Sequence, residues 1–305
     1  MQFDVVGLGC SAYDILCVVR QWPEPDQKIA AEELLQQGGG PVATGLVAVA
    51  RLGGRAAIIG KVGDDDFGRF MVNELAAEGV DTRAMQLGPP GGSHFAFCVA
   101  DRSTGKRTIF FYRGRGDPLP PERVDRELVV SGRALLVDGN HMQAAVRAAG
   151  WAREAGIPVV MDAEHYRKGL DDLIHRVDYL VPSREFAVEA AGTEDPVEAA
   201  RQLTQWGPHT VIVTLGADGC AGVHKGEAIS QPGFRVDVVD TTGAGDVFHG
   251  VVCLGLAWGW EMPRVLRYAC AVAALKCRKL GGRSGIPSLR EADEFLRTAT
   301  GMGEG

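Results

Sequence analysis

The segment Val238–Gly250 (VVDTTGAGDVFHG) joins a turn of small residues to an acidic residue and an apolar stretch. Gly243, Ala244 and Gly245 have little or no side chain, so their backbone N–H groups can approach an anion closely. The following apolar residues predict a helix, whose N-terminus carries a partial positive charge. Asp246 falls in its first turn, where a carboxylate can cap the helix or take a proton from a hydroxyl that attacks a phosphoryl group. With an ordinary pKa of about 3.9, such a base is ionised at pH 7.

Two further aspartates directly follow short buried strands. Asp138 follows the strand predicted at 134–137, and Asp162 follows the one predicted at 158–161. Ligands of parallel α/β sheets gather at the carboxyl ends of strands, so both carboxylates are candidates to line the site. Arg113 follows the apolar run TIFFY and could bind a carboxylate, sulfonate or phosphate through two hydrogen bonds, or simply end a solvated hairpin.

The elements that must position these residues alternate between strand-like and helix-like patterns. The strands are expected at 3–8, 56–59, 134–137, 158–161, 179–181 and 211–214, and the helices at 41–52, 67–78, 143–154, 184–191, 196–206, 244–258 and 263–280. Such alternation predicts βαβ units and a Rossmann-like α/β fold: a central, mostly parallel sheet with helices on both faces.

Two regions, 12–37 and 93–113, interrupt this alternation with runs typical of short strands and a hairpin turn at 102–105. They predict a small β-sheet lid, which leaves 1–11, 38–92 and 114–297 to the α/β domain. The apolar runs HFAFCV and TIFFY would leave exposed faces on that lid. We therefore expect a homodimer through the lid.

Charge and composition exclude several classes of protein. The 39 acidic residues outnumber the 32 basic ones, for a net charge of −7, which argues against a nucleic-acid partner. No 18-residue apolar run and no secretory leader are present, so we expect no membrane partner. Seven scattered cysteines indicate a reducing compartment and hence the cytoplasm. The sequence contains no Walker A pattern, so we do not expect a P-loop enzyme.

Four motifs together resemble one known family. They are Gly39-Gly40 before a small-residue helix, IGKVGDDDFG at 59–68, TLGADG at 214–219 and DTTGAGD at 240–246. In order and spacing, over about residues 3–290, the chain resembles the ribokinase-like carbohydrate kinases of the PfkB family. The resemblance implies a ribokinase-like fold, a sugar as acceptor, and ATP with Mg²⁺ as donor.

The resemblance also implies roles for individual positions. Asp246 matches the catalytic base, and Gly243, Ala244 and Gly245 match the anion hole. The positions that match sugar-binding ones are Asp14, Gly39, Gly40 and Thr44. The positions that match nucleotide-binding ones are Thr214, Gly216, Gly219, Ala274 and Gly282. Asp240 and Thr242 match a site that in some members holds a monovalent cation, so K⁺ is a further candidate.

The chain departs from the family pattern where an Asn-x-x-Glu motif is usual. The aligned residues are Ser183, Arg184, Glu185 and Phe186, which leaves Glu185 as the candidate magnesium ligand. Magnesium often keeps several waters and leans on substrate phosphates, so the departure questions the metal's usual arrangement rather than the reaction.

Within the family, the stretches 38–44, 234–250, 272–277 and 281–287 most resemble sulfofructose kinases. That resemblance implies a ketose whose far end carries a sulfonate held by a Lys, an Asn and an Arg. Lys28 matches the Lys, whereas Phe111 and Asn140 stand at the other two positions. We therefore expect a kinase for a ketose or acidic sugar (sulfofructose-like, fructose-like or a sugar acid). The alternatives are a nucleoside or ribose kinase and a non-catalytic sugar sensor.

Overall fold

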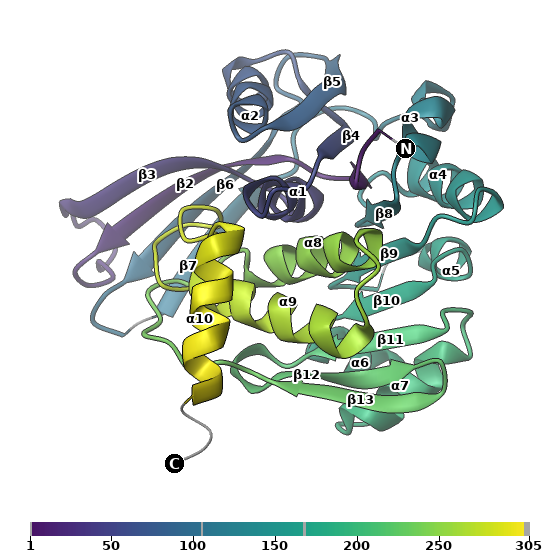
Figure 1. The fold of residues 1–305 in the computed structure, drawn as a ribbon. Coiled ribbons are helices and arrows are strands. Elements are labelled where there is room, and N and C mark those ends of the chain that lie inside the picture. The colour runs from purple at the N-terminus through teal and green to yellow at the C-terminus, as the bar shows by residue number, and fades with distance from the viewer. Residues whose placement is uncertain (1, 105, 167–168, 302–305) are drawn as a thin grey trace.

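A computed structural model describes residues 2–104, 106–166 and 169–301 (Figure 1). Its large sheet has nine strands in the order β13-β12-β11-β10-β9-β8-β1-β4-β5, parallel from β5 to β11 and antiparallel from β11 to β13. The strands are β1 (Val5–Leu8), β4 (Ala56–Gly63), β5 (Val80–Gly88), β8 (Ala134–Val137), β9 (Val159–Ala163), β10 (Tyr179–Pro182), β11 (Thr210–Thr214), β12 (Gly219–His224) and β13 (Glu227–Pro232).

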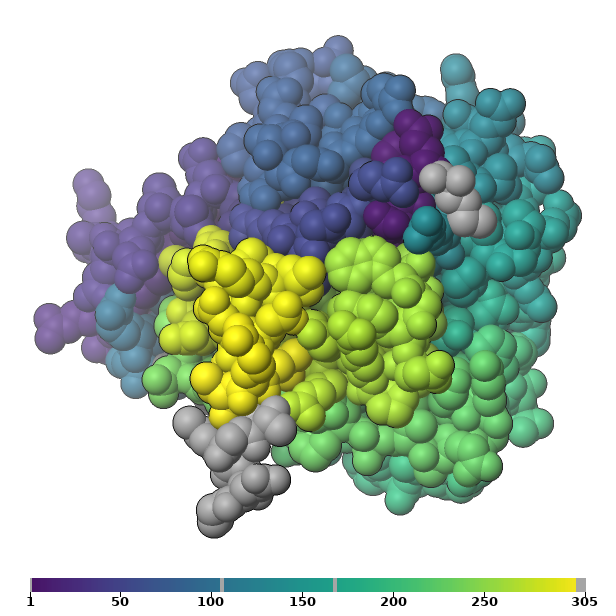
Figure 2. All heavy atoms as spheres, in the orientation of Figure 1, coloured from purple at the N-terminus to yellow at the C-terminus, as the bar shows by residue number. Residues whose placement is uncertain are grey.

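Helices cover both faces of this sheet. They are α1 (Pro41–Arg51), α2 (Asp66–Ala77), α3 (Arg126–Ser131), α4 (Met142–Glu154), α5 (Leu170–Ile174), α6 (Arg184–Ala191), α7 (Pro196–Thr204), α8 (Ala244–Ala257), α9 (Met262–Lys276) and α10 (Leu289–Gly301). In space-filling form, α10 (yellow) lies beside α8 and α9 (green) on one side of the molecule (Figure 2). Within the described residues, no helix is long and apolar enough to span a bilayer.

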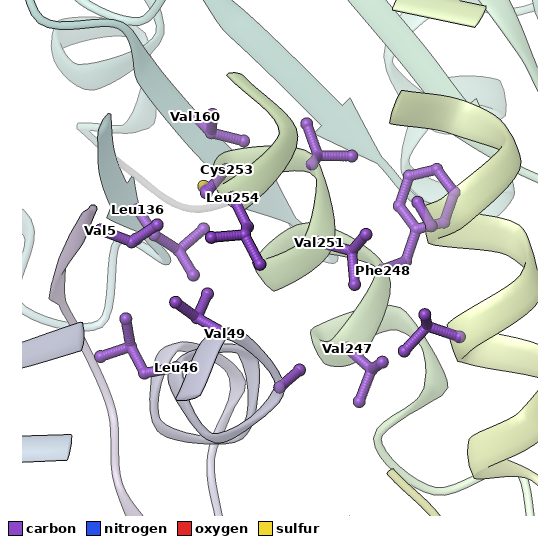
Figure 3. Packing of buried hydrophobic residues seen from close by; sticks show 14 of the residues in the cluster. Val5, Leu46, Val49, Leu136, Val160, Val247, Phe248, Val251, Cys253 and Leu254 are labelled. Carbon is purple, nitrogen blue, oxygen red and sulfur yellow. The ribbon is translucent and has the colours of Figure 1, made fainter. Parts of the chain in front are cut away.

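The continuous apolar strands are explained by burial on both faces. Successive residues of β8 alternate between two hydrophobic clusters: Leu136 packs with α1 and α8 on one side, and Leu135 packs with α4 on the other. Figure 3 shows the first cluster, with Leu136, Val5 and Leu46 gathered around α1 and α8. A sheet buried on both sides needs apolar residues at consecutive positions, as the sequence pattern predicted.

Helices α1 and α8 approach each other closely at two glycines. A Cβ on Gly250 would overlap the backbone of Gly45, and a Cβ on Gly45 would lie 3.0 Å from the carbonyl oxygen of Asp246. This close crossing places the first turn of α8 beside α1. The fold thereby packs the backbone of Asp246 against the helix that follows the Gly39-Gly40 turn.

The smaller sheet has the strand order β3-β2-β6-β7 and is called the small sheet below. Its strands are β2 (Ala12–Val19), β3 (Ala31–Gly39), β6 (His94–Asp101) and β7 (Lys106–Tyr112), and they project from one end of the large sheet (Figure 1). Both interrupting regions therefore contribute two strands each, and the predicted α/β fold with a second sheet is confirmed. Gly105, in the predicted hairpin turn, lies outside the described residues.

Several elements were absent from the sequence prediction: β5, β12, β13, α3, α5 and α10. The β12–β13 hairpin turns at Lys225 and Gly226, both with positive φ, and a Lys-Gly pair is a weaker turn signal than Asn-Gly. The helix expected to reach residue 280 ends at Lys276, and Gly281, with φ +90°, lies in the loop beyond it.

Candidate active site

The N-terminus of α8 has no side-chain cap. Gly243 occupies the N-cap position with φ +75°, and a Cβ there would lie 2.9 Å from the carbonyl oxygen of Gly282. Gly245 is exposed, and no heavy atom lies within 4 Å of where its Cβ would be. The first amides of a helix have no intrahelical acceptor. The N–H groups of Gly243, Ala244 and Gly245, called the anion cradle below, lie at the positive end of a helix, with open space at Gly245, while the Ala244 N–H donates to the carbonyl oxygen of Thr241 at 3.2 Å.

Asp246 follows the anion cradle directly and is half-buried. Burial, together with the nearby carboxylates of Asp162 and Glu164, raises the pKa of its carboxyl group to about 8, although His249 opposes this shift. The ordinary pKa expected from the sequence is therefore wrong for the unliganded protein. A carboxyl group with a pKa near neutrality is suited to accept a proton and release it again.

Asp14, on β2, lies against the glycine turn that precedes α1. A Cβ on Gly39 would overlap the Asp14 carboxylate, and Gly40 takes φ +93° so that its Cα fits against the carbonyl oxygen of Cys10. Burial raises the pKa of Asp14 to about 6, although Arg283 lowers it. Asp14 also contributes to the raised pKa of Asp246. The structure therefore groups Asp14, Gly39, Gly40 and Asp246, which the sequence had assigned to one site.

Arg283, which the sequence analysis did not single out, contacts two of the predicted site residues, Gly39 and Thr44. It is 1% exposed, and its Nη1 lies 2.5 Å from Oε2 of Glu74. Its Nη2 donates to the carbonyl oxygen of Gly39 at 3.0 Å, and its Nε donates to Oγ1 of Thr44 at 3.4 Å. Thr44, expected to bind sugar, is 1% exposed and takes part in this network instead. The available signal was only a basic residue inside the glycine-rich stretch 281–285.

Asp138 lies at the carboxyl end of β8, but its carboxylate is engaged by backbone. Oδ2 accepts a hydrogen bond from the N–H of Cys10 at 2.7 Å, and Oδ1 accepts one from the N–H of Asn140 at 2.9 Å. Asp138 also lines a small pocket together with Pro41, Asp162 and other residues. Its visible role is to tie the ends of β1 and β8 together beside that pocket.

Asp162 and His249 form a buried pair under the first turn of α8. Nδ1 of His249 lies 3.4 Å from Oδ2 of Asp162 and 2.6 Å from the carbonyl oxygen of Gly245. Its Nε2 lies 2.9 Å from the carbonyl oxygen of Val181, at the end of β10. The imidazole thus connects the large sheet to the helix that carries Asp246.

Three predicted nucleotide-binding residues, Thr214, Gly216 and Gly219, lie where β11 turns into β12. Thr214 ends β11, and its Oγ1 donates to the carbonyl oxygen of Pro182 at 3.3 Å. Gly216 has φ +60°. Gly219 has φ +94°, and a Cβ there would overlap the backbone of Gln231 and Gly233. Packing alone therefore requires glycine at position 219, whatever ligand binds.

The other two predicted nucleotide-binding residues belong to the C-terminal part of the chain. Ala274 is half-buried on α9, whereas Gly282 is buried and packs against Gly243. The loop that follows α9 therefore touches the N-cap of α8. This contact brings Gly282 next to the anion cradle.

Asp240 and Thr242, assigned to a monovalent cation, are occupied by donors of the chain itself. Oδ1 of Asp240 accepts from the N–H and Oγ1 of Thr242, at 2.9 and 2.7 Å, and lies 3.3 Å from Nη1 of Arg107. Oδ2 accepts from the N–H of Gly281 at 2.9 Å, and the carbonyl oxygen accepts from Nζ of Lys276 at 2.8 Å. Because donors of the chain itself already bind these side-chain oxygens, Asp240 and Thr242 fit a separate K⁺ ion poorly.

Three predicted residues lie away from this group. Lys28 is exposed between β2 and β3, at the opposite end of that hairpin from Asp14, which pairs with Gln37. Arg113 is exposed after β7, with its guanidinium 5.6 Å from the ring centroid of Phe111. Glu185 is exposed in the first turn of α6. Among the described residues, no group of three or more His, Cys, Asp or Glu side chains could hold a metal ion.

Known structures share this architecture almost in full. A putative ribokinase from Agrobacterium tumefaciens superposes with a TM-score of 0.91 at 28% identity, covering 99% of both chains. A putative ribokinase II from E. coli, solved in complex with ATP and Mg²⁺, superposes with a TM-score of 0.84 at 24% identity, covering 97% of this chain and 99% of that one. The fold is therefore the ribokinase-like α/β fold.

Sequence comparison leads from the fold to the family. Ribokinase of Haemophilus influenzae is 29% identical over 300 residues, which is 96% of this chain and 98% of that protein. The 2-dehydro-3-deoxygluconokinase of Thermoproteus tenax is 32% identical over 271 residues, 82% of each chain. The profile of the pfkB family carbohydrate kinases matches residues 3–289. The chain belongs to this family and is a phosphotransferase that acts on a sugar hydroxyl.

Proposed function

We propose that this protein transfers the γ-phosphoryl group of ATP to a hydroxyl of a ketose or an acidic sugar, of the sulfofructose, fructose or sugar-acid type. The observation that carries the proposal is that Asp246 directly follows the anion cradle and that its carboxyl group interacts electrostatically with Asp14, which packs against Gly39. A sugar hydroxyl next to Asp246 would face a phosphoryl group bound at the anion cradle. ATP is supported by the ribokinase II structure, which was solved with ATP and Mg²⁺.

The chemistry assigned to the chain's own residues is a proton transfer and an anion clamp. Asp246 takes the proton of the attacking hydroxyl, whose oxygen forms a bond to the γ-phosphorus as the bond to the β,γ-bridging oxygen breaks and ADP leaves. The anion cradle stabilises negative charge on the transferring group. Asp14 accepts hydrogen bonds from sugar hydroxyls, and the 214–219 loop contacts the nucleotide phosphates.

Magnesium would enter mainly with the nucleotide. The acidic side chains that act electrostatically on Asp246 include Asp162 and Glu164, whereas Glu185 is exposed in the first turn of α6. A magnesium ion held by phosphates and waters, with few direct carboxylate ligands, fits this set of residues. When bound, Mg²⁺ neutralises charge on the β- and γ-phosphates.

The small sheet is proposed to act as a lid, formed by residues 12–37 and 93–113. By strand register, Asp14, Ala96 and Phe111 are directly opposite one another and so share one face of the sheet. Arg113 lies two residues beyond Phe111 and stacks on it, on this same face. An acidic sugar held at Asp14 would therefore extend toward Phe111 and Arg113, which would bind its anionic end.

The opposite face of the small sheet supports the proposed homodimer. Leu34 is 65% exposed and Phe110 is 54% exposed, and both lie on the face opposite to Asp14. Large exposed apolar side chains on a sheet face favour association with a second copy. All seven cysteines are free thiols, which supports a reducing compartment such as the cytoplasm.

The test is a phosphorylation screen with ATP and Mg²⁺ against ketoses, sulfosugars, sugar acids, ribose and nucleosides, with ADP release and product mass as readouts. We expect turnover on a ketose or acidic sugar, and Asp246→Asn should lower kcat by about 10²- to 10⁴-fold with little change in ATP affinity. Glu194→Gln, at an exposed loop carboxylate, is the control. Near-normal turnover in Asp246→Asn would refute the assignment of the base.

The same screen separates the substrate classes. Arg113→Ala should raise KM for an acidic sugar and leave KM for a neutral ketose unchanged. Turnover confined to ribose or nucleosides would overturn the proposed substrate but keep the kinase. Sugar binding without turnover across the whole panel would instead indicate a sensor.

A further inference from the structure

Lys276, the last residue of α9, is a buried cation beneath the turn that leads to the anion cradle. Its side chain is fully buried, at 0% exposure, and Nζ donates to the carbonyl oxygen of Asp240 at 2.8 Å. The carbonyl oxygen of Cys277 accepts hydrogen bonds from the N–H groups of Val239 and Asp240, at 2.8 and 3.1 Å. The end of α9 is therefore joined to this turn through both backbone and side chain.

A second cation reaches the same turn from the small sheet. Nη1 of Arg107, on β7, lies 3.3 Å from Oδ1 of Asp240, 3.1 Å from Oγ1 of Thr241 and 2.8 Å from Oγ1 of Thr242. Burial lowers the pKa of Lys276, and the Asp240 carboxylate opposes that effect. Asp240 thus has its carboxylate next to one cationic side chain and its carbonyl oxygen bound to another.

The side-chain oxygens of Asp240 and Thr242 already have hydrogen-bond partners within the described chain. Burial alone would raise the pKa of Asp240, but hydrogen bonds from Thr242 and Gly281 hold it below its ordinary value. Among the described residues, the buried side-chain nitrogen and oxygen atoms without a hydrogen-bond partner are on Ser11 and His141, outside this turn. Lys276 and Arg107 therefore already place two positively charged groups at the turn that contains Asp240.

We propose that the ammonium group of Lys276 replaces a free monovalent cation in this protein, so that its kinase activity does not depend on K⁺. The inference rests on the proposed sugar kinase function. An ammonium group carries the same single charge as K⁺ in a similarly compact form, and it directs its donors at oxygen atoms. It is also attached to the fold, so its occupancy does not vary with the salt composition.

The effect on catalysis is indirect, which makes Lys276 a positioning residue. Asp240 holds Thr242 through two hydrogen bonds, and Thr242 immediately precedes Gly243 of the anion cradle. Without the ammonium, the Asp240 carbonyl and carboxylate would lose a buried positive partner. The turn would then shift, and the anion cradle would move relative to the transferring phosphoryl group.

The unmodified protein gives the first test. Initial rates and thermal unfolding are measured in KCl, NaCl and choline chloride at equal ionic strength, with potassium-free ATP. We expect kcat, KM and the unfolding midpoint to agree among the three salts, with rates within about twofold. A several-fold activation by K⁺, or a rise of the midpoint in K⁺ alone, would overturn the proposal.

Variants give the second test. Lys276→Met keeps most of the length of the side chain but removes its charge, and we expect kcat to fall about tenfold or more because a charge-assisted hydrogen bond is lost. Lys276→Ala opens space for an ion, and we expect K⁺ or ethylammonium to restore part of its activity and raise its unfolding midpoint. Lys279→Met, at an exposed lysine three residues on, is the matched control.

Each outcome decides between the alternatives. Full activity of Lys276→Met would overturn the proposal, and so would a Lys276→Ala variant that gains neither activity nor thermal stability from either cation. If neither variant folds, the salt comparison on the unmodified protein decides. If no sugar is phosphorylated, the proposed function fails, while the midpoints in the three salts still report whether a K⁺ site exists.

Discussion

The backbone of Gly39 packs directly against the carboxylate of Asp14, so that a Cβ at position 39 would overlap Oδ2. These two residues lie near the paired ends of β2 and β3, where the chain leaves the small sheet to enter α1. The neighbouring carbonyl oxygen of Gly39 accepts from Arg283 at 3.0 Å, which fixes that end of β3. The direction of the Asp14 carboxylate thus depends on glycine at position 39.

Gly39→Ala is predicted to impair sugar binding selectively. The new methyl group must displace the Asp14 carboxylate, and loss of a charge-assisted hydrogen bond to a sugar hydroxyl should raise KM for the sugar about tenfold or more. ATP affinity should not change. Steady-state kinetics in both substrates measures this. The control is Gly150→Ala on α4, where a Cβ meets no atom within 4 Å. An unchanged sugar KM in Gly39→Ala would show that Asp14 does not bind the sugar.

The activity is predicted to rise with pH up to about 8. Asp246 has a pKa of about 8 in the unliganded protein, so its basic form is a minority at pH 7 and becomes dominant above pH 8. The kcat/KM of the free enzyme should follow that ionisation. Asp162→Asn should move the profile to lower pH, because the Asp162 carboxylate helps to raise the pKa of Asp246. A profile that is flat between pH 6 and 9 would contradict the prediction.

The ionisation of Asp246 should affect stability in the opposite direction: the free energy of unfolding should fall as pH rises, whereas the activity should rise. Between the ordinary pKa of 3.8 and about 8, the folded protein keeps a proton on Asp246 that the unfolded chain has released, so this group makes folding less favourable as pH rises. Asp246→Asn lacks that ionisation. Its unfolding midpoint should match that of the unmodified protein near pH 4 and exceed it increasingly up to pH 8. Equal midpoints at pH 8 would count against a raised pKa.

Breaking the ion pair between the buried Arg283 and Glu74 is predicted to destabilise the fold strongly. Glu74→Gln leaves the buried Arg283 guanidinium without its carboxylate, which should lower the free energy of unfolding by about 3–5 kcal/mol. The double variant Glu74→Leu with Arg283→Met should recover much of this loss. Urea titration measures both. The exposed Arg69–Asp64 pair serves as the control, and Arg69→Ala should change stability little.

The proposed dimer predicts different effects for the two faces of the small sheet. Phe110→Asp introduces a charge on the face opposite to Asp14 and should convert a dimer into a monomer in sedimentation at micromolar concentration. Phe111→Asp introduces the same charge on the face shared with Asp14 and should leave the dimer intact. A monomer for the unmodified protein, or a dimer that survives Phe110→Asp, would exclude this interface.

Local patterns in the sequence determined most of the fold. Strands such as β1 and β8 are short apolar runs, and both faces of the sheet are buried, so each position had to be apolar. The start of α8 was likewise readable, because Gly243 supplies a positive φ and Asp246 falls in the first turn. These features depend on residues that are only a few positions apart in the chain, and local sequence patterns can reveal such short-range relationships.

The electrostatic character of the site was decided only by the tertiary structure. Arg283 forms its ion pair with Glu74, which is more than 200 residues away in the chain. Lys276, at the end of α9, donates a hydrogen bond to the carbonyl oxygen of Asp240 in the turn before α8. Burial and the Asp162 carboxylate raise the pKa of Asp246. Burial and charge pairing depend on which distant segments pack together. For that reason the sequence could point to the proposed base, whereas its raised pKa and the buried lysine bonded to the preceding turn follow only from the fold.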